Sequence, residues 1–422
     1  MHRSTIGLLL SLLTLAGVGT RASADELRVT LDEALAEARR ANAVLPVARL
    51  DAEGAEAAVG EAQGRRLPSL AFDGDVHTGA PQKYASSDAR AQLVASMPLF
   101  DGGRLRAGVT SSLAAAAAAR ARSHQAERDV DLQVRARFAE FLAAEREIAF
   151  RSAGLERLRT YLSIIDARRA SGQGIASDRS KTLVRLGEGE ADIADAQRRL
   201  DDAKLQLNDL MGRPPDAPLE LEPPPPPTAP PSVTPDEPWL SAPEVTQADA
   251  SAQAASAAVT IVRADRWPTV SVLANGGAQP VIGNSREALL NNGEGWGGEF
   301  LLQFNLPLWD AGVYSSRLAQ ANLEEKAARQ QVTATQRAAR LEWQLAAARL
   351  RNLEREVAAR TLAIDTARDS YLQAESLYRG GVGTALDVLE AYDAWTNANR
   401  AHADAELRYR VSEAELIRWG SP

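Results

Sequence analysis

The sequence of 422 residues contains no cysteine and few aromatic residues. The absence of cysteine excludes disulfide bonds, thiolate metal sites and a catalytic thiol. Aromatic residues make up only 5% of the chain, and much of its apolar content is alanine. Small apolar residues favour closely packed helices over a thick globular core. After the N-terminal segment, no run approaches about 18 uncharged apolar residues, so the sequence predicts no transmembrane helix.

The N-terminus has the features of a secretory signal peptide. His2 and Arg3 precede an apolar run from Ile6 to Val18, and the small residues before Asp25 predict cleavage after Ala24. The whole chain has 48 basic and 56 acidic side chains, a formal charge of −8. Removing residues 1–24 takes away two arginines, which leaves 46 basic against 56 acidic side chains and a charge of −10. We therefore expect no nucleic-acid partner.

Two long helices dominate the pattern. No proline interrupts Arg104 to Arg169, which permits one helix of about 65 residues and roughly 100 Å. An apolar residue recurs at every seventh position within it, and the same seam recurs 209 positions later. The seam residues are Val134, Phe141, Ile148, Leu155 and Leu162, then Trp343, Leu350, Val357, Ile364 and Tyr371. This spacing is typical of helices that supercoil around their neighbours.

Each copy of the long helix follows a predicted pair of strands. In the first copy, apolar and polar residues alternate over residues 69–77 and 90–97; in the second, they alternate over 270–272 and 299–306. Alternation predicts strands with one apolar and one polar face. A chain with about four strands cannot close even the smallest membrane barrel of about eight strands. We therefore expect several copies to combine their strands, because an open sheet edge is not stable in lipid.

The predicted fold is mainly α with a small β part. It consists of a long coiled-coil α-helical barrel and a transmembrane β-barrel, with four strands per chain and two internal repeats. Residues 25–213 form the first repeat, with a helix from Thr30 to about Gly64, the strand pair, the long helix and a return helix capped by Ser177 or Asp178. Residues 214–243 form a proline-rich, extended connector outside the core. Residues 244–422 form the second repeat.

Several repeated motifs resemble those of the TolC-type outer membrane efflux proteins. They are the Thr30 to Leu35 helix start, the Leu-Pro-Ser and Trp-Pro-Thr strand starts, the Pro-Leu-Phe-Asp-Gly-Gly and Pro-Leu-Trp-Asp-Ala-Gly strand exits, and the segment from Tyr378 to Ala391. The resemblance implies a homotrimer with a shared twelve-stranded barrel in outer membrane lipid and a helical barrel across the periplasm of a Gram-negative cell. It also implies docking to a periplasmic adaptor (membrane fusion protein) and an inner-membrane pump of the RND or ABC type. The function implied is the exit duct of a tripartite efflux or type I secretion system.

The resemblance also implies a constricted periplasmic entrance at the helical turns. By position, the acidic residues of this gate are Asp387 and Glu390, with Tyr378 packed nearby and Asp178 a weaker match. A ring of carboxylates around a pore attracts cations. An alternative role for Asp387 is simply to cap its helix. Glycines predicted to form the two turns are Gly172 and Gly174, then Gly381 and Gly383.

Four aromatic residues at predicted strand ends are candidates for a belt at the membrane surface: Phe100, Trp267, Trp296 and Trp309. The alternative for each is ordinary packing.

We predict neither a cofactor nor an enzyme. His77, His124 and His402 are scattered, so a metal site is not expected. The glycines after Arg379 follow a helix and lack a lysine, unlike a phosphate-binding loop. No nucleophile and base can be combined. Two alternative classes are a periplasmic adaptor and a structural coiled-coil rod, but neither would contain two copies of strand pair plus long helix.

Overall fold

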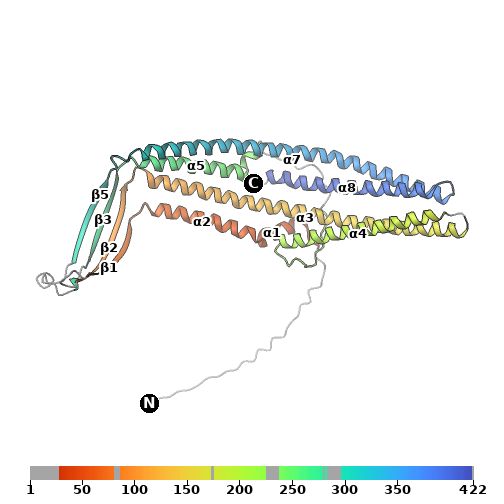
Figure 1. The fold of residues 1–422 in the computed structure, drawn as a ribbon, viewed down its shortest axis with the longest axis horizontal. Helices are drawn as coiled ribbons and strands as arrows, with labels where there is room; N and C mark the ends of the chain where they lie inside the picture. The colour runs from red at the N-terminus through yellow and green to blue at the C-terminus, as the bar shows by residue number, and fades with distance from the viewer. Residues whose placement is uncertain are drawn as a thin grey trace, which may run out of the picture.

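The computed structural model describes residues 28–79, 86–172, 175–224, 237–278, 281–282 and 296–420. Two long helical hairpins lie side by side, and a small sheet extends from one end of them (Figure 1). The helices are α1 (Leu31–Ala41), α2 (Val44–Gly64), α3 (Arg104–Ala170), α4 (Ala176–Leu210), α5 (Pro243–Ala264), α7 (Val313–Arg379) and α8 (Ala385–Gly420), with a 3₁₀ turn η1 (Pro238–Ser241). In the described part of the chain, no helix has the length and apolar character needed to cross a membrane.

The two long helices and their apolar seams are confirmed. Helices α3 and α7 each contain 67 residues. None of the ten seam residues is exposed, and half of them, including Val134 and Tyr371, are buried. Shorter helices complete each repeat: α2 and α4 pack along α3, while α5 and α8 pack along α7 (Figure 1). Since α5 and α8 also contact α3, they join the two repeats into one layer of helices.

The sheet has the strand order β1-β2-β3-β5, with all neighbours antiparallel. Its strands are β1 (Ser69–Gly79), β2 (Ser86–Phe100), β3 (Thr269–Ala278) and β5 (Trp296–Asn305). A two-residue strand, β4 (Val281–Ile282), pairs with β2 and adds to the four strands predicted. Pairing of β2 with β3 joins the two repeats through the sheet as well.

The predicted two-sided character of the strands is also confirmed. Apolar residues pair across the strands, for example Phe72 with Leu93 and Val272 with Leu302. Neighbouring positions pair polar residues, such as Ser271 with Gln303. The apolar side chains are open to solvent in the single chain: Phe72 is 70% exposed and Leu302 is 59% exposed. A single chain therefore leaves an apolar sheet face uncovered.

The predicted continuous helix over residues 31–64 is wrong, because it breaks at Asn42. The Asn42 backbone is extended, and its side-chain Oδ1 accepts a hydrogen bond from the Val44 amide at 2.9 Å. Its Nδ2 donates to the Leu210 carbonyl at the end of α4, at 3.1 Å. At its start, α1 has a capping box formed by Thr30 and Glu33. A contact distant in sequence therefore ends α1 at Ala41.

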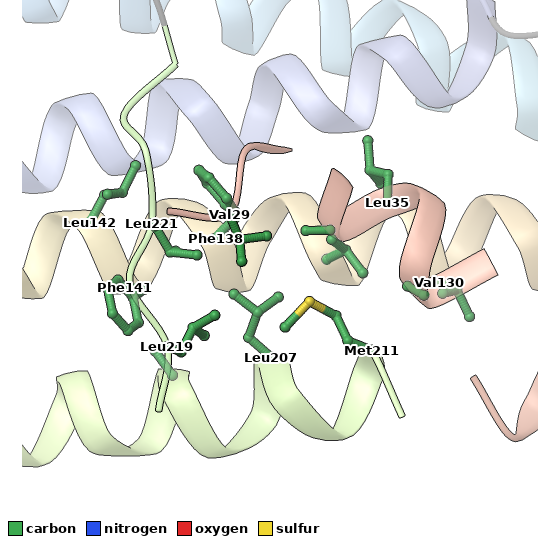
Figure 2. Packing of buried hydrophobic residues seen from close by; sticks show 14 of the residues in the cluster. Val29, Leu35, Val130, Phe138, Phe141, Leu142, Leu207, Met211, Leu219 and Leu221 are labelled. Carbon is green, nitrogen blue, oxygen red and sulfur yellow. The ribbon is translucent and has the colours of Figure 1, made fainter. Parts of the chain in front are cut away.

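The predicted connector over residues 214–243 is not wholly outside the core. Leu219 and Leu221 are buried against α3 and α4, and Leu221 forms a parallel bridge with Val29 (Figure 2). At the other end, Trp239 is buried, with its ring centroid 5.1 Å from that of Trp343. Alternate apolar residues in this proline-rich stretch thus complete a hydrophobic cluster where α1, α3 and α4 meet.

This cluster predicts a position-dependent loss of stability on α4. Leu207 is fully buried in it, whereas Leu205, two residues earlier, is 43% exposed. Leu207→Ala should lower the free energy of unfolding by about 2–5 kcal/mol, and Leu205→Ala should cost much less. Thermal or urea unfolding of the purified variants measures the difference. Equal losses in the two variants would contradict the packing described.

Candidate functional site at the helical tips

The turns of the two hairpins lie together at the end of the molecule farthest from the sheet (Figure 1). Gly172 and Gly381 adopt left-handed backbone angles, with φ of 76° and 81°. Gly383 has a different role: a Cβ there would lie 3.1 Å from the Tyr378 amide nitrogen. Gly174 lies outside the described residues. Glycine is therefore favoured by backbone conformation at two of these positions, and at the third a larger residue would crowd the backbone of α7.

An aromatic cluster lies directly below the turns and contains the predicted residue Tyr378. Tyr378 is only 4% exposed, and its ring centroid lies 5.2 Å from that of Tyr161 on α3. Tyr371 stacks on Trp395 at 5.4 Å. Burial raises the pKa of Tyr371 to about 12. Uncharged side chains in this cluster pack the helices of the two repeats against each other.

Arg168, which the sequence analysis did not identify, fastens α3 to α7 at the tips. Its Nη2 donates a hydrogen bond to the Tyr378 carbonyl at 2.7 Å. Its guanidinium carbon also lies 4.4 Å from the centroid of the Tyr378 ring, a cation–π distance. The last turns of the two long helices are thereby joined through one side chain. A second link between the hairpins is the Arg185–Asp393 ion pair, at 2.6 Å, between α4 and α8.

Asp387 and Glu390 are exposed on the first turns of α8, next to this cluster. The Asp387 carboxylate accepts a hydrogen bond from the Thr384 amide at 2.9 Å, and the Asp387 amide donates to the Thr384 hydroxyl at 3.2 Å. These bonds form a capping box in which Thr384 is the cap and Asp387 its partner. The bond from the Thr384 amide, followed by that with its side chain, lowers the pKa of Asp387. Between the two acids, Val388 and Leu389 are buried and anchor the helix.

Asp178 lies in the first turn of α4 and is partly exposed. The prediction that Ser177 or Asp178 caps this helix is wrong: α4 begins at Ala176, and Ile175 occupies the cap position without a side-chain hydrogen bond. Burial, and then Tyr378 and Asp178, raise the pKa of Tyr161. The negative charge of Asp178 thus acts on Tyr161, on the neighbouring helix.

The two hairpins differ in the ion pairs that hold each one together. In the first hairpin, four pairs join α3 to α4: Arg199–Glu147 at 2.8 Å, Arg159–Glu190 at 3.4 Å, Arg179–Asp166 at 3.0 Å, and Arg151–Asp192. In the second hairpin, the pair equivalent to Arg199–Glu147 is present as Arg408–Glu356, at 2.9 Å. In each of the other three pairs, one charged residue has no charged equivalent 209 positions later. Val388 stands in place of Arg179, Asn399 in place of Glu190, and Ala401 in place of Asp192. Between Glu356 and the tip, the described residues contain no ion pair from α7 to α8.

The predicted belt residues divide between the two ends of the sheet. Phe100, Trp267 and Trp309 are 46%, 58% and 86% exposed and lie where the strands join the helices. Trp296 begins β5 at the opposite end, and its side chain lies outside the described residues. Three aromatic side chains thus lie exposed at one end of an apolar sheet face.

No group of three or more histidine, aspartate or glutamate side chains in the described part of the chain is arranged to hold a metal ion. His124, one of the scattered histidines, lies beside Glu127 on α3, with 3.7 Å between Nδ1 and the carboxylate oxygen.

Three comparisons with known proteins agree with this architecture. A 178-residue segment is 27% identical to the probable efflux pump outer membrane protein TtgC of Pseudomonas putida, covering 42% of this chain and 36% of that protein. The aligned segment thus spans only about a third of the length of that relative. The structure resembles the outer membrane protein VceC of Vibrio cholerae with a TM-score of 0.80 and 21% identity, over 93% of this chain and 96% of that one. It also resembles the MtrE outer membrane channel of Neisseria gonorrhoeae in its open state, with a TM-score of 0.78 and 22% identity, over 92% and 88% of the two chains.

The sequence profile of the outer membrane efflux protein family matches residues 34–213 and 235–419, which together form most of the chain. The unmatched residues between them fall within the proline-rich connector. The chain is therefore a member of the outer membrane efflux protein family.

Proposed function

We propose that this protein is the outer membrane exit duct of a tripartite efflux or type I secretion system. In this role it is a passive conduit across the periplasm and the outer membrane, built from three copies of the chain. The observation that carries the proposal is the exposed apolar face of a four-stranded sheet at the end of two 67-residue helices. Family membership supports the same function.

Closure of the sheet requires more than one copy. Strands β1 and β5 are the outer strands of the described order, so each has a free edge for another strand. Unpaired backbone groups are costly in lipid, where no water replaces the missing hydrogen bonds. Three copies of the four main strands give twelve, enough to close a barrel with its apolar face toward lipid. The same arrangement places the helical hairpins in a cylinder that extends into the periplasm.

The conduit needs partners to connect it to the inner membrane. We propose a periplasmic adaptor and an inner-membrane pump of the RND or ABC type, docking at the helical tips. The name of TtgC, an efflux pump outer membrane protein, supports this class of assembly. A periplasmic adaptor or a structural rod is disfavoured for this chain, because neither accounts for an exposed apolar sheet face.

At the tips, we propose that Asp387 and Glu390 line the constricted entrance, with Tyr378 and Asp178 supporting it. Their support is the exposure of both acids beside a buried aromatic anchor. The α7/α8 hairpin is the part that moves, because three ion pairs that brace α3/α4 have no equivalent in it. Arg168 then acts as a latch that holds α7 against α3 in the closed entrance.

The apolar sheet face yields a test of membrane insertion. Leu302→Lys places a charge on that face, whereas Gln303→Lys places the same charge on the polar face one residue away. A lysine facing lipid costs about 2–4 kcal/mol at mid-membrane, so Leu302→Lys should reduce the amount of protein in the outer membrane fraction. Gln303→Lys should leave it unchanged. Equal recovery of the two variants would refute the proposed orientation.

The entrance carboxylates yield a test of ion selectivity. In planar lipid bilayers, the double variant Asp387→Asn with Glu390→Gln should lose much of the preference for cations over anions, since the ring loses its negative charge. Glu324→Gln, on α7 outside the tips, is the control and should keep the preference. An unchanged reversal potential in the double variant would exclude these residues from the constriction.

The latch yields a test of conductance. Arg168→Ala removes the bond to the Tyr378 carbonyl and should raise single-channel conductance in the absence of partners. Arg169→Ala, the adjacent residue, is an exposed arginine of the same helical turn and serves as the control. If both variants conduct like the unmodified protein, Arg168 does not hold the entrance closed.

A further inference from the structure

Seven exposed arginines surround the junction between sheet and helices, and we refer to them as the arginine collar. They lie at the ends of the four helices that meet the sheet: Arg65 and Arg66 after α2, Arg104 and Arg106 at the start of α3, Arg263 and Arg266 at the end of α5, and Arg317 in α7. The register of the strands brings all four of these ends to the same edge of the sheet. The collar is basic, although the whole chain has a net charge of −8.

The acidic residues nearby do not neutralise the collar. Asp101 and Asp310 accept hydrogen bonds from the amides that open α3 and α7. Glu61 pairs with Arg65, and Asp265 pairs with Arg104 and, at 4.0 Å, with Arg317. These contacts leave Arg66, Arg106 and Arg263 with no ion pair among the described residues, and Arg266 with only the ring of Tyr314, 5.8 Å away.

Helix dipoles explain only part of this arrangement. Cations are stabilised at the C-terminal ends of helices, which accounts for the arginines that follow α2 and α5. Arg104 and Arg106 instead lie in the first turn of α3, where the helix dipole disfavours a cation and no acidic residue is present in the turn. The amides at this helix start already donate to Asp101, and Arg104 pairs with Asp265, so the side chain of Arg106 is the group available to an external anion.

The surface next to the collar indicates which anion. Phe100, Trp267 and Trp309 are exposed at the same edge, and the apolar face of the sheet follows. The order along the molecule is therefore apolar, aromatic and basic, which matches the acyl chains, interface and phosphates of a lipid leaflet.

The two repeats share one element of the collar: Arg66 and Arg266 both stand two residues before the proline that precedes a strand.

We propose that the arginine collar binds the phosphate groups of anionic phospholipids in the inner leaflet of the outer membrane. This inference rests on the proposed function, since it requires the sheet to lie in that membrane. Each juxtamembrane arginine contributes roughly fivefold to the affinity for an anionic surface. The collar thereby fixes the depth at which the sheet ends and the helices begin.

The test compares lipid binding by two triple variants with the same change in charge. The collar variant is Arg66→Gln, Arg106→Gln and Arg263→Gln, which leaves the ion pairs of Arg65, Arg104 and Arg317 intact. The control is Arg337→Gln, Arg351→Gln and Arg355→Gln, three exposed arginines on α7 outside the collar. Purified protein is titrated with phosphatidylglycerol or phosphatidylcholine, and binding is followed by native mass spectrometry and by the thermal midpoint.

We expect the unmodified protein and the control to prefer phosphatidylglycerol, with a preference that decreases as salt is raised. In the collar variant, the affinity for phosphatidylglycerol relative to phosphatidylcholine should fall by about two orders of magnitude. The variant should still be recovered from the outer membrane. Retention of the preference in the collar variant, equal loss in the control, or no preference in the unmodified protein would overturn the proposal. Failure of the unmodified protein to reach the outer membrane would overturn the proposed function as well.

Discussion

The backbone hydrogen bonds at the edges of the sheet are the constraint on which the rest of this structure depends. Strands β1 and β5 are the outer strands of the described order, and the apolar face between them is exposed. A free edge can persist in water, but in lipid its amides and carbonyls have no alternative partner. The chain therefore requires further strands from outside itself. In the proposed channel, copies of the same chain supply them, because each copy has two outer strands, β1 and β5.

That requirement extends from the sheet to the helices. Each strand pair leads through an aspartate-capped turn into a 67-residue helix, so copies that join their strands also bring their long helices side by side. The two hairpins differ in their ion pairs toward the tips. Ion pairs brace α3/α4 up to its tip, whereas Ala401 and Asn399 replace the equivalents of Asp192 and Glu190 in α7/α8. Aromatic packing, Arg168 and the Arg185–Asp393 pair then hold α7/α8 against α3/α4 at the tips.

The sequence predicted what depends on local periodicity. The sevenfold seam beginning at Val134 and the alternation around Phe72 each follow from side-chain spacing, and both recur in the second repeat. The features it missed depend on contacts distant in sequence. Asn42 ends a helix because its amide reaches Leu210, and Leu221 is buried because it pairs with Val29. At the tips, position in the sequence predicts which acids line the proposed entrance, but the contact of Arg168 with Tyr378 spans 210 residues and leaves no local pattern.

The proposed channel exists only if copies of the chain complete one another. Native mass spectrometry of the protein extracted from the outer membrane measures this directly. The result expected is a single species of three chains that remains associated when the detergent is exchanged. A membrane-extracted protein that is monomeric, yet conducts ions in a planar bilayer, would contradict the claim that one chain cannot enclose a channel.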